Sequence, residues 1–324
     1  MDNLFSATNL SKTFQLRKRS RGLGSHRFVK AVDGISFDVK LGETFGIVGE
    51  SGCGKTTTAR LIMQLEKATG GQMLFKDTDM TNLNSRATKK MRRHVQMIFQ
   101  DPYTALNPVK TIFYLVAEPL KIHKVYKNKN ELMEKVRETL NAVGLPSTDD
   151  LLAKRPDALS GGERQRVGIA KALVLDPEFV VADEPVSMLD ASVRAEIVNL
   201  MLKLKAQRDL TYVFITHEFD VAYAICDRVA IMYAGSIIEL GNTEDIIHDP
   251  LHPYTRLLLD AVPPLRPDKN WGNNIAKGEV AYYIAQPSGC KYQLRCDKRT
   301  DACSGDTPVL IEKSPGHYVA CHLD

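Results

Sequence analysis

The chain has 324 residues, of which 44% are hydrophobic and 25% are charged, and its formal net charge is +4. These proportions are typical of a globular protein, and the length allows two domains or one large domain with an appendage. The small charge does not indicate a nucleic-acid partner, and no run of about 18 apolar residues predicts a transmembrane helix. Residues 1–5 lack a basic region followed by an apolar stretch, so we expect no signal peptide and a cytosolic chain.

The first predicted strands are the β-rich runs at 35–39 and 44–48. A basic, glycine-containing stretch at 15–24 precedes them. We interpret it as a solvated loop, with contact to anionic lipid headgroups as the alternative. The second run leads into a match to G-x-x-x-x-G-K-[ST] and then into a helical pattern over 56–65. The matching residues are Gly49, Glu50, Ser51, Gly52, Cys53, Gly54, Lys55 and Thr56.

This order of strand, loop and helix predicts a phosphate-binding loop. Backbone N–H groups of such a loop surround phosphates, and Lys55 can reach the β- and γ-phosphates. The start of the following helix adds partial positive charge. The alternative is a glycine-rich turn with no ligand, and a second nucleotide motif farther along the chain argues against it. We interpret Cys53 as a small filler that could make the loop sensitive to oxidation.

The middle of the chain predicts an inserted helical subdomain. Strands are expected at 73–75 and 95–99, and residues 111–145 then follow a helical pattern with lysine-rich stretches. Apolar runs resume at 179–182 and 211–215, each followed by a helical segment. Strands that alternate with helices and are buried on both faces predict a largely parallel α/β sheet.

Two further segments carry chemistry. The run at 179–184 ends in Asp183 and Glu184, which places an acid that can help to hold Mg²⁺ at the end of a buried strand. Ahead of it, in 159–166, two glycines open a helix behind Ser160. Free N–H groups and a hydroxyl there form a second anion site, unless the segment is only a helix cap. One domain does not need two γ-phosphate sites unless the second serves another subunit.

Taken in order over about residues 4–240, these motifs resemble those of the ATPase subunit of an ABC transporter. The segments that carry the resemblance are 49–56, 99–102, 159–166, 183–185, 187–190 and 216–217. The resemblance implies an α/β fold: a P-loop ABC-type nucleotide-binding domain with a helical subdomain and a small C-terminal cysteine-containing extension. It also implies an ATPase that uses ATP and Mg²⁺.

The family implies a role for each matching residue. Glu184 would be the general base, and His217 would contact the γ-phosphate and orient water, with an ordinary exposed histidine as the alternative. Phe14 would stack on adenine, with a core aromatic as the alternative. ATP contacts are expected from Gly49, Ser51, Gly52, Gly54, Lys55, Thr56, Thr57, Gln100 and Asp183, and Mg²⁺ ligands from Thr56, Gln100 and Asp183.

The resemblance further implies a pair of ATPase subunits, the second a paralogue or another copy. One chain would close on the other's ATP through Ser160, Gly161, Gly162 and Gln165, and Asp190 would link the two sites. Two positions depart from the family. Glu163 stands where many members have glutamine, and Met188 replaces the more usual alanine. Neither removes a catalytic group, so we expect a hydrolysing subunit rather than a non-catalytic regulatory one.

Residues beyond 240 resemble the ATPases of peptide and nickel importers, especially at 252–255 and 257–263. The resemblance implies import of di- or oligopeptides with two transmembrane permease subunits and an extracytoplasmic substrate-binding protein. It places the chain at the cytoplasmic face of the membrane and implies no nucleic acid. Nickel, glutathione or another small solute is the alternative. A soluble non-transport ABC ATPase is a further one, although single motifs and the absence of sustained heptads disfavour it.

A proline-rich break at 262–267 precedes a tail with four of the six cysteines. We predict an ABC ATPase domain at 1–250, its helical subdomain at about 105–175, and a peptide-importer-type extension at 251–324. Cys290, Cys296, Cys303 and Cys321 follow the spacing C-x5-C-x6-C-x17-C. A tail this small cannot readily bury a core of its own, so a metal bound by four thiolates would supply its fold.

The identity of that metal has several alternatives. The tail resembles that of peptide-importer ATPases, some of which carry a [4Fe–4S] cluster there, and this favours an iron–sulfur cluster with a structural role. Zn²⁺ is the rival, although its usual C-x2–4-C spacing is absent. His317 and His322 could replace a cysteine ligand. Scattered free cysteines and, less readily in a reducing cytosol, disulfides remain.

Overall fold

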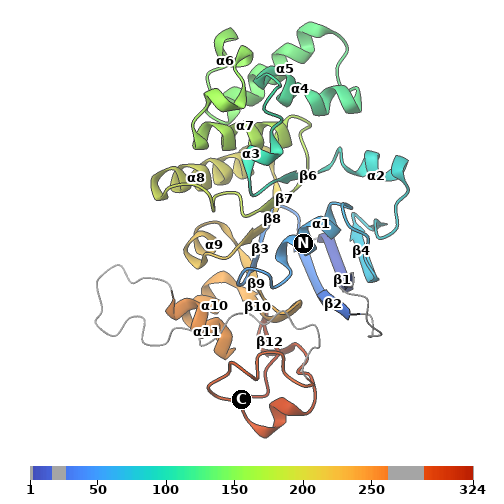
Figure 1. The fold of residues 1–324 in the computed structure, drawn as a ribbon, viewed down its shortest axis with the longest axis vertical. Coiled ribbons are helices and arrows are strands. Elements are labelled where there is room, and N and C mark those ends of the chain that lie inside the picture. The colour runs from blue at the N-terminus through green and yellow to red at the C-terminus, as the bar shows by residue number, and fades with distance from the viewer. Residues whose placement is uncertain (1–2, 17–26, 262–287, 324) are drawn as a thin grey trace, which may run out of the picture. The chain divides into compact units, whose positions relative to one another are not determined.

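The computed structural model describes residues 3–16, 27–261 and 288–323 (Figure 1). Most of the basic stretch at 15–24 and the whole proline-rich break at 262–267 lie outside these ranges. The chain divides into two compact units. The first comprises Met1–Val39, Thr44–Asn82 and Thr216–Asp324, and the second comprises Lys40–Glu43 and Leu83–Ile215.

The first unit contains an antiparallel sheet that the sequence analysis did not predict as such. Its order is β2 (Arg27–Lys40), β1 (Asn3–Leu16), β4 (Gly70–Phe75) and β5 (Thr78–Asp79). In β1, buried side chains at Phe5, Ala7 and Leu10 face the core, whereas Thr8 is exposed. The rings of Phe5 and Phe37 lie 5.8 Å apart, and Phe37 stacks on Phe45 at 5.1 Å. These aromatic contacts join the antiparallel sheet to the next strand, β3.

The first unit also contains β3 (Thr44–Val48), which pairs in parallel with β9 (Arg228–Tyr233). Every residue of β3 is buried, as expected for a strand covered on both faces. Antiparallel pairing continues from β9 to β10 (Ser236–Asn242), β12 (His317–Val319) and β11 (Ile311–Ser314). The helices of this unit are α1 (Lys55–Ile62), α9 (Phe219–Ile225), α10 (Thr243–His248) and α11 (Pro253–Asp260), with the short η2 (Asp301–Ser304) in the tail.

The second unit is built on three parallel strands, paired in the order β6 (Val95–Ile98), β7 (Phe179–Asp183) and β8 (Thr211–Thr216). Helix α8 (Ala191–Arg208) connects β7 to β8, which is the usual link between parallel strands. Helix α7 (Gly161–Leu173) contacts α4 (Ile112–His123), and α4 contacts α5 (Lys129–Ala142). The remaining helices are α2 (Ser85–Met91), α3 (Pro102–Ala105), α6 (Asp149–Ala153) and η1 (Pro156–Ala158).

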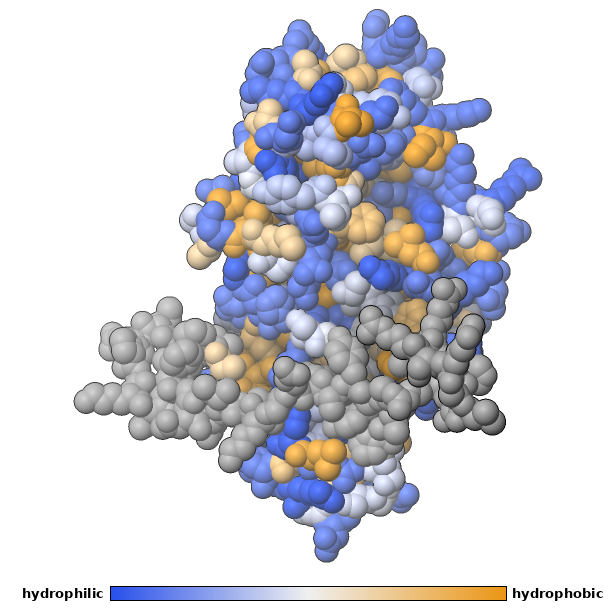
Figure 2. Space-filling view, in the orientation of Figure 1, coloured by the Kyte–Doolittle hydropathy of each residue, from blue (hydrophilic) through white to orange (hydrophobic). Residues whose placement is uncertain are grey.

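The structure confirms the α/β class and refines the prediction of a largely parallel sheet. Parallel pairs include β3–β9 and β6–β7–β8, whereas β1 pairs antiparallel with β4, and β12 pairs antiparallel with β10 and β11. Among the described residues, no helix has the length and apolar character needed to cross a membrane. The face drawn in Figure 2 is mainly hydrophilic, with apolar side chains in small separate groups.

Candidate functional site

The predicted phosphate loop joins the end of β3 to the start of α1, within the first unit. Two of its glycines have no room for a side chain. A Cβ on Gly49 would lie 2.3 Å from the carbonyl oxygen of Met232, and one on Gly54 would lie 2.2 Å from that of Ala31. Gly54 also has φ of 115°, a conformation that other residues rarely adopt. Because Gly54 caps α1 without a side chain, the helix start is left open toward an anion.

Lys55 is buried in this loop, with 4% of its surface exposed. Its Nζ donates hydrogen bonds to the carbonyl oxygens of Gly49 at 2.7 Å and Glu50 at 3.1 Å. The lysine is thus held against its own loop. Ser51 and Gly52 lie exposed on the outer side of the loop, and Thr56 and Thr57 are half-buried in the first turn of α1.

Cys53 is almost completely buried in the loop. Burial raises the pKa of its thiol, and the nearby Lys55 opposes that shift only in part. A buried thiol that stays protonated reacts slowly. The geometry therefore favours the interpretation of Cys53 as a small filler over that of a site of oxidation.

Phe14 and His217 also belong to the first unit. Phe14 is half-buried near the end of β1, and the Lys12 ammonium lies 4.7 Å from its ring centroid. Phe14 is therefore not a fully buried core aromatic. His217 follows β8 with 41% of its side chain exposed, and its Nε2 lies 3.8 Å from a carboxylate oxygen of Glu218. Their roles toward a nucleotide remain predictions.

In the second unit, Glu184, the predicted base, contacts Gln100, one of the predicted Mg²⁺ ligands. Asp183 ends β7 with 3% of its surface exposed, and Glu184 follows it with 8% exposed. The Nε2 of Gln100 donates to Oε2 of Glu184 at 3.0 Å. Glu184 has φ of 46°, in the left-handed region that costs energy for a residue other than glycine. Its N–H donates to the carbonyl oxygen of Ile215 at 2.9 Å, which holds this conformation.

The segment at 159–166, predicted to form a second anion site, opens α7, and its geometry explains the glutamate at position 163. Ser160 is the N-cap, and its hydroxyl accepts a hydrogen bond from the Glu163 N–H at 3.3 Å. The Glu163 carboxylate accepts bonds from both the N–H and the hydroxyl of Ser160, each at 2.8 Å. These bonds from Ser160 lower the pKa of Glu163. Glu163 is therefore the third helical residue of a capping box, a place that suits glutamate and glutamine alike.

The other residues predicted to reach the ATP of a second subunit are held by contacts near the starts of α7 and α8. A Cβ on Gly162 would meet Cγ1 of Val193 at 2.7 Å, so α7 approaches α8 closely at this point. Gln165 is buried, whereas Gly161 is only half-buried. Asp190 is exposed and caps α8, because its Oδ1 accepts from the Val193 N–H at 3.0 Å. Met188 is 57% exposed, which explains why this substitution for alanine leaves the packing intact.

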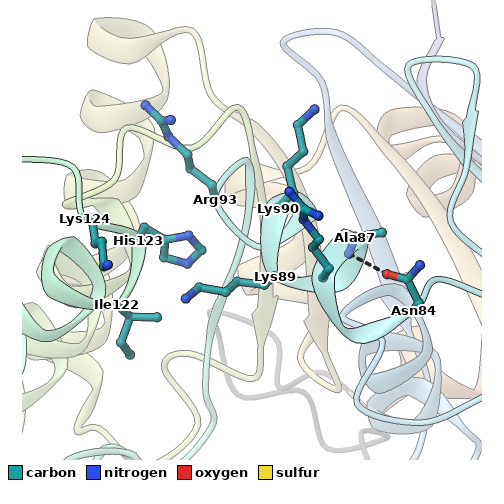
Figure 3. Close-up of a pocket in the computed structure, with 9 residues that line it drawn as sticks. Asn84, Ala87, Lys89, Lys90, Arg93, Ile122, His123 and Lys124 are labelled. Atoms are coloured by element: carbon teal, nitrogen blue, oxygen red, sulfur yellow. Dashed lines mark hydrogen bonds between the residues drawn. The ribbon is translucent and has the colours of Figure 1, made fainter.

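A basic hollow forms a separate feature of the second unit. It has a volume of about 580 Å³, and Figure 3 shows cationic side chains of α2 and of the end of α4 around it. Partial burial of His123 lowers the pKa of its ring, and the nearby Lys89 and Arg93 lower it further. None of the lining residues belongs to the predicted nucleotide set. They are Asn84, Arg86, Ala87, Lys89, Lys90, Arg93, Ile122, His123 and Lys124.

The tail brings its four cysteines into one small region of the first unit. Cys290 and Cys303 are buried, and Cys296 and Cys321 are half-buried. Burial raises the pKa of Cys290, and the nearby thiols of the other three raise it further. None of the six cysteines, all within the described ranges, forms a disulfide, so the structure gives no support to the alternative of disulfides. No group of three or more potential ligands in the described ranges is arranged to hold a metal ion.

Two predicted substitute ligands have other partners. The Nε2 of His317 lies 2.8 Å from Oε1 of Glu239, and both side chains are buried. The Nε2 of His322 lies 2.9 Å from the carbonyl oxygen of Asp306. Because these ring nitrogens are used within the protein, the alternative that either histidine replaces a cysteine ligand finds no support here.

The sequence analysis did not predict that a residue of the tail contacts the phosphate loop. The carboxylate of Glu50 pairs with the Arg295 guanidinium from the tail, at 2.7 Å and 3.0 Å. Glu50 occupies a variable position of the loop motif, and no periodicity relates it to Arg295. The one available signal was the position of Arg295 next to Cys296 in the sequence.

Comparisons with known proteins agree with this geometry. The ABC transporter family matches residues 32–187, and the oligopeptide/dipeptide transporter C-terminal region matches residues 238–303. The oligopeptide transport ATP-binding protein AppF of Bacillus subtilis is 45% identical, with 91% of this chain and 90% of AppF covered. OppF of the same organism, with the same description, is also 45% identical over 90% of each chain.

Solved structures match as well. A dimeric post-hydrolysis state of the ATP-binding cassette MJ0796, bound to ADP and Pi, gives a TM-score of 0.64 at 27% identity. That match covers 74% of this chain and 98% of the other. CbiO1 from Clostridium perfringens, part of an ABC transporter complex, gives a TM-score of 0.64 at 26% identity, covering 77% and 92%. The chain therefore belongs to the ATP-binding proteins of ABC transporters, in the oligopeptide and dipeptide transport group.

Proposed function

We propose that the chain is the ATP-hydrolysing subunit that powers import of di- and oligopeptides through partner permeases. The observation that carries this proposal is the match to oligopeptide transport ATP-binding proteins over about nine-tenths of the chain, including the C-terminal region at 238–303. The family accounts for ATP hydrolysis with Mg²⁺. The solute rests on the relatives, so nickel, glutathione or another small solute remains the alternative.

For the reaction, we assign a role to each predicted site residue. Lys55 would exchange its bonds to the loop carbonyls of Gly49 and Glu50 for bonds to phosphate oxygens. Glu184 would accept the proton of the attacking water on its carboxylate, which Gln100 holds in place. His217 would orient that water. When bound, Mg²⁺ neutralises phosphate charge, with Thr56, Gln100 and Asp183 as the residues that would hold it.

Other residues would bind the adenine ring or would reach the nucleotide from a second subunit. Phe14, which is only half-buried, would stack on adenine. Ser160 and the glycines that follow it would close on ATP held by a second ATPase subunit, a paralogue or another copy, with Asp190 linking the two sites. The dimeric state of the matched cassette MJ0796 supports this arrangement.

We further propose that this pair works with two transmembrane permeases and an extracytoplasmic substrate-binding protein, at the cytoplasmic face of the membrane. The proposed boundaries remain an ATPase domain at 1–250, with its helical subdomain at about 105–175, and an extension at 251–324. The match of the C-terminal region from residue 238 onward supports a distinct extension.

The four tail cysteines are proposed to hold a [4Fe–4S] cluster with a structural role, with Zn²⁺ as the alternative. Neighbouring thiols support the proposal, because together with burial they raise the pKa of Cys290 and Cys296, and a bound metal would offset that cost. The four side chains would have to converge on the metal, since the described residues hold no group already arranged to bind one. The test is purification without oxygen, with iron, acid-labile sulfide and zinc measured together. Iron and sulfide in stoichiometric amounts support the cluster. Zinc without sulfide would assign the site to Zn²⁺. If no metal is found, the four cysteines are free thiols.

The solute is tested by uptake in cells that lack this chain. We expect loss of labelled dipeptide uptake, restored by the wild-type chain but not by Glu184→Gln. Uptake of nickel and of glutathione in the same cells serves as the comparison. Normal peptide uptake together with loss of nickel or glutathione uptake would contradict the peptide assignment.

A further inference from the structure

We propose that Arg295, in the cysteine-bearing tail, is a positioning residue for the phosphate loop and acts through the carboxylate of Glu50. The inference rests on the proposed role of this loop in holding ATP. It assigns to the tail a function that its cysteines alone do not give it, namely control of nucleotide affinity.

The contact has the geometry of a strong ion pair. Nη1 of Arg295 donates to Oε2 of Glu50 at 2.7 Å, and Nη2 donates to Oε1 at 3.0 Å. Such paired bonds fix the orientation of both groups as well as their distance. The Arg295 side chain is 7% exposed and that of Glu50 is 26% exposed, so water screens the pair only weakly.

A second contact fixes the backbone of the same loop residue. The Tyr254 hydroxyl accepts a hydrogen bond from the N–H of Glu50 at 3.1 Å and lies 3.3 Å from its Oε2. Tyr254 belongs to α11 and is fully buried. Its ring centroid lies 4.7 Å from that of Tyr233 and 5.3 Å from that of Tyr292. Glu50 is therefore held through both its carboxylate and its amide.

Arg295 lies against this aromatic group. Its guanidinium is 5.8 Å from the ring centroid of Tyr233 and 5.9 Å from that of Tyr292. The bonds to Glu50 raise the pKa of Arg295, so the guanidinium stays charged. A charge in such a setting needs its partner, because removing one member of a buried pair leaves the other uncompensated.

The consequence for ATP follows from the position of Glu50 in the loop. The carbonyl oxygen of Glu50 accepts the bond from Lys55 Nζ at 3.1 Å and one from the Cys53 N–H at 3.3 Å. Shifting Glu50 would therefore move the first turn of the loop and the resting place of Lys55. The loop binds phosphate in the ground state, so we expect loss of ATP affinity rather than of the chemical step.

The tail has other anchors, which supply a matched control. Lys291 Nζ donates to Oδ2 of Asp33 at 2.8 Å and to the Ser236 hydroxyl at 2.6 Å. This ion pair is also largely buried and joins the same tail to the same unit. The hydrogen bonds of Lys291 Nζ to Asp33, Ala234 and Ser236 do not involve a residue of the phosphate loop. Lys291→Gln therefore weakens docking without removing the proposed coupling.

The experiment compares Arg295→Gln, Arg295→Lys, Glu50→Gln, the double variant Arg295→Gln with Glu50→Gln, and Lys291→Gln, each in the full chain assembled with its partners. ATP binding, KM and kcat are measured, together with the melting temperature. We expect Arg295→Gln to weaken ATP binding and raise KM by about 10-fold, because a charge-assisted bond is lost, with kcat within about twofold. Arg295→Lys should recover part of the affinity, and the double variant should be no weaker than the weaker single variant.

Three results would overturn the inference. The first is normal ATP affinity of Arg295→Gln, and the second is an equal loss of affinity in Lys291→Gln at an equal melting temperature. The third is full additivity in the double variant. Lys55→Ala separates the two proposals. If Lys55→Ala binds ATP normally, the proposed nucleotide site is wrong. If Lys55→Ala loses ATP binding while Arg295→Gln binds ATP normally, only the proposed role of Arg295 is wrong.

Discussion

The phosphate loop and the cysteine-bearing tail reach order by different physical routes. In the loop, Lys55 bonds to the carbonyl oxygens of near neighbours in the chain, five and six residues away. The tail depends on distant partners, since Arg295 and Lys291 pair with residues 245 and 258 positions earlier. Lys55 is therefore held by contacts within a short motif, whereas the tail is held in place by ion pairs between residues far apart in the sequence.

This difference predicts where substitutions act. Changes in the motif residues should alter hydrolysis or binding of ATP with little effect on stability. Changes in the tail contacts should alter stability and, through Glu50, affinity. The expected effects below run from the largest to the smallest.

The largest effect is expected for Glu184→Gln. Removing the proposed general base should slow hydrolysis by about 10²–10⁴-fold and leave ATP bound in a closed pair. Gln100 can still donate to the amide oxygen of the new side chain, so the local structure should persist. The measurement is turnover and nucleotide occupancy with every copy of the subunit altered.

Glu163→Gln is the matched control, because it makes the same chemical change in the capping box of α7. Its turnover should stay close to normal. If Glu184→Gln also hydrolyses ATP at a near-normal rate, Glu184 is not the base.

The second effect concerns the pairing of subunits. In a pair of identical chains, Lys55→Ala in one chain and Ser160→Arg in the other should damage the same composite site and spare the second. Both changes in one chain, beside a wild-type partner, should damage both sites. Tight ATP binding should therefore survive at one site in the first arrangement and at none in the second. Equal binding in both arrangements would mean that each site is complete within one chain.

The third effect is a loss of stability at the base of the tail. Glu239 is fully buried and accepts hydrogen bonds from the Leu251 N–H at 2.7 Å and the His252 N–H at 2.9 Å, and it pairs with His317. Glu239→Ala should lower the free energy of unfolding by about 2–5 kcal/mol, because these donors lose their acceptor. Urea denaturation gives this value.

Glu244→Ala, at an exposed position on α10, is the control and should change the unfolding free energy by less than about 0.5 kcal/mol. The reactivity of Cys290 and Cys303 toward a thiol reagent should rise in Glu239→Ala only. Unchanged stability in both variants would show that Glu239 does not anchor the tail.

The smallest effect is a dependence of stability on pH through His252. Burial lowers the pKa of His252 to about 3, and its Nδ1 accepts a bond from the Tyr254 N–H at 3.0 Å. In the unfolded chain the pKa is about 6.5, so below that pH the unfolded state binds the extra proton. Between pH 6.5 and the folded-state pKa, stability should therefore fall as the pH falls, by up to about 1.4 kcal/mol per pH unit.

His252→Asn keeps a side-chain acceptor for the N-cap of α11 and cannot be protonated in this range. The difference in unfolding free energy between the two proteins should widen in favour of His252→Asn from pH 7 to pH 5.5. A constant difference over this interval would show that His252 does not titrate between the folded and unfolded states.

The parts of the fold that follow from local pattern were predictable from sequence. The predicted strand at 44–48 coincides with β3, and the runs at 179–182 and 211–215 fall within β7 and β8. Continuous burial on both faces produces such apolar runs. By contrast, β1 mixes polar and apolar residues, and its pairing with β4 depends on residues about 70 positions later, which local pattern does not encode.

The same limit applies to the candidate site. The loop residues, Asp183 and Glu184 were identified because each motif is contiguous. The capping role of Glu163 was also readable, since serine followed by glutamate three residues later is a helix-start pattern. The pairs Arg295–Glu50 and His317–Glu239 were not readable, because folding alone brings these residues together.

Coupling of ATP hydrolysis to peptide import is tested most directly in proteoliposomes that contain the chain and its proposed partners, namely a second ATPase subunit, two permeases and a substrate-binding protein. We expect ATP hydrolysis to rise when dipeptide or oligopeptide is added, peptide to accumulate, and both to cease with Glu184→Gln. Hydrolysis that responds to nickel or glutathione but not to peptide would contradict the account.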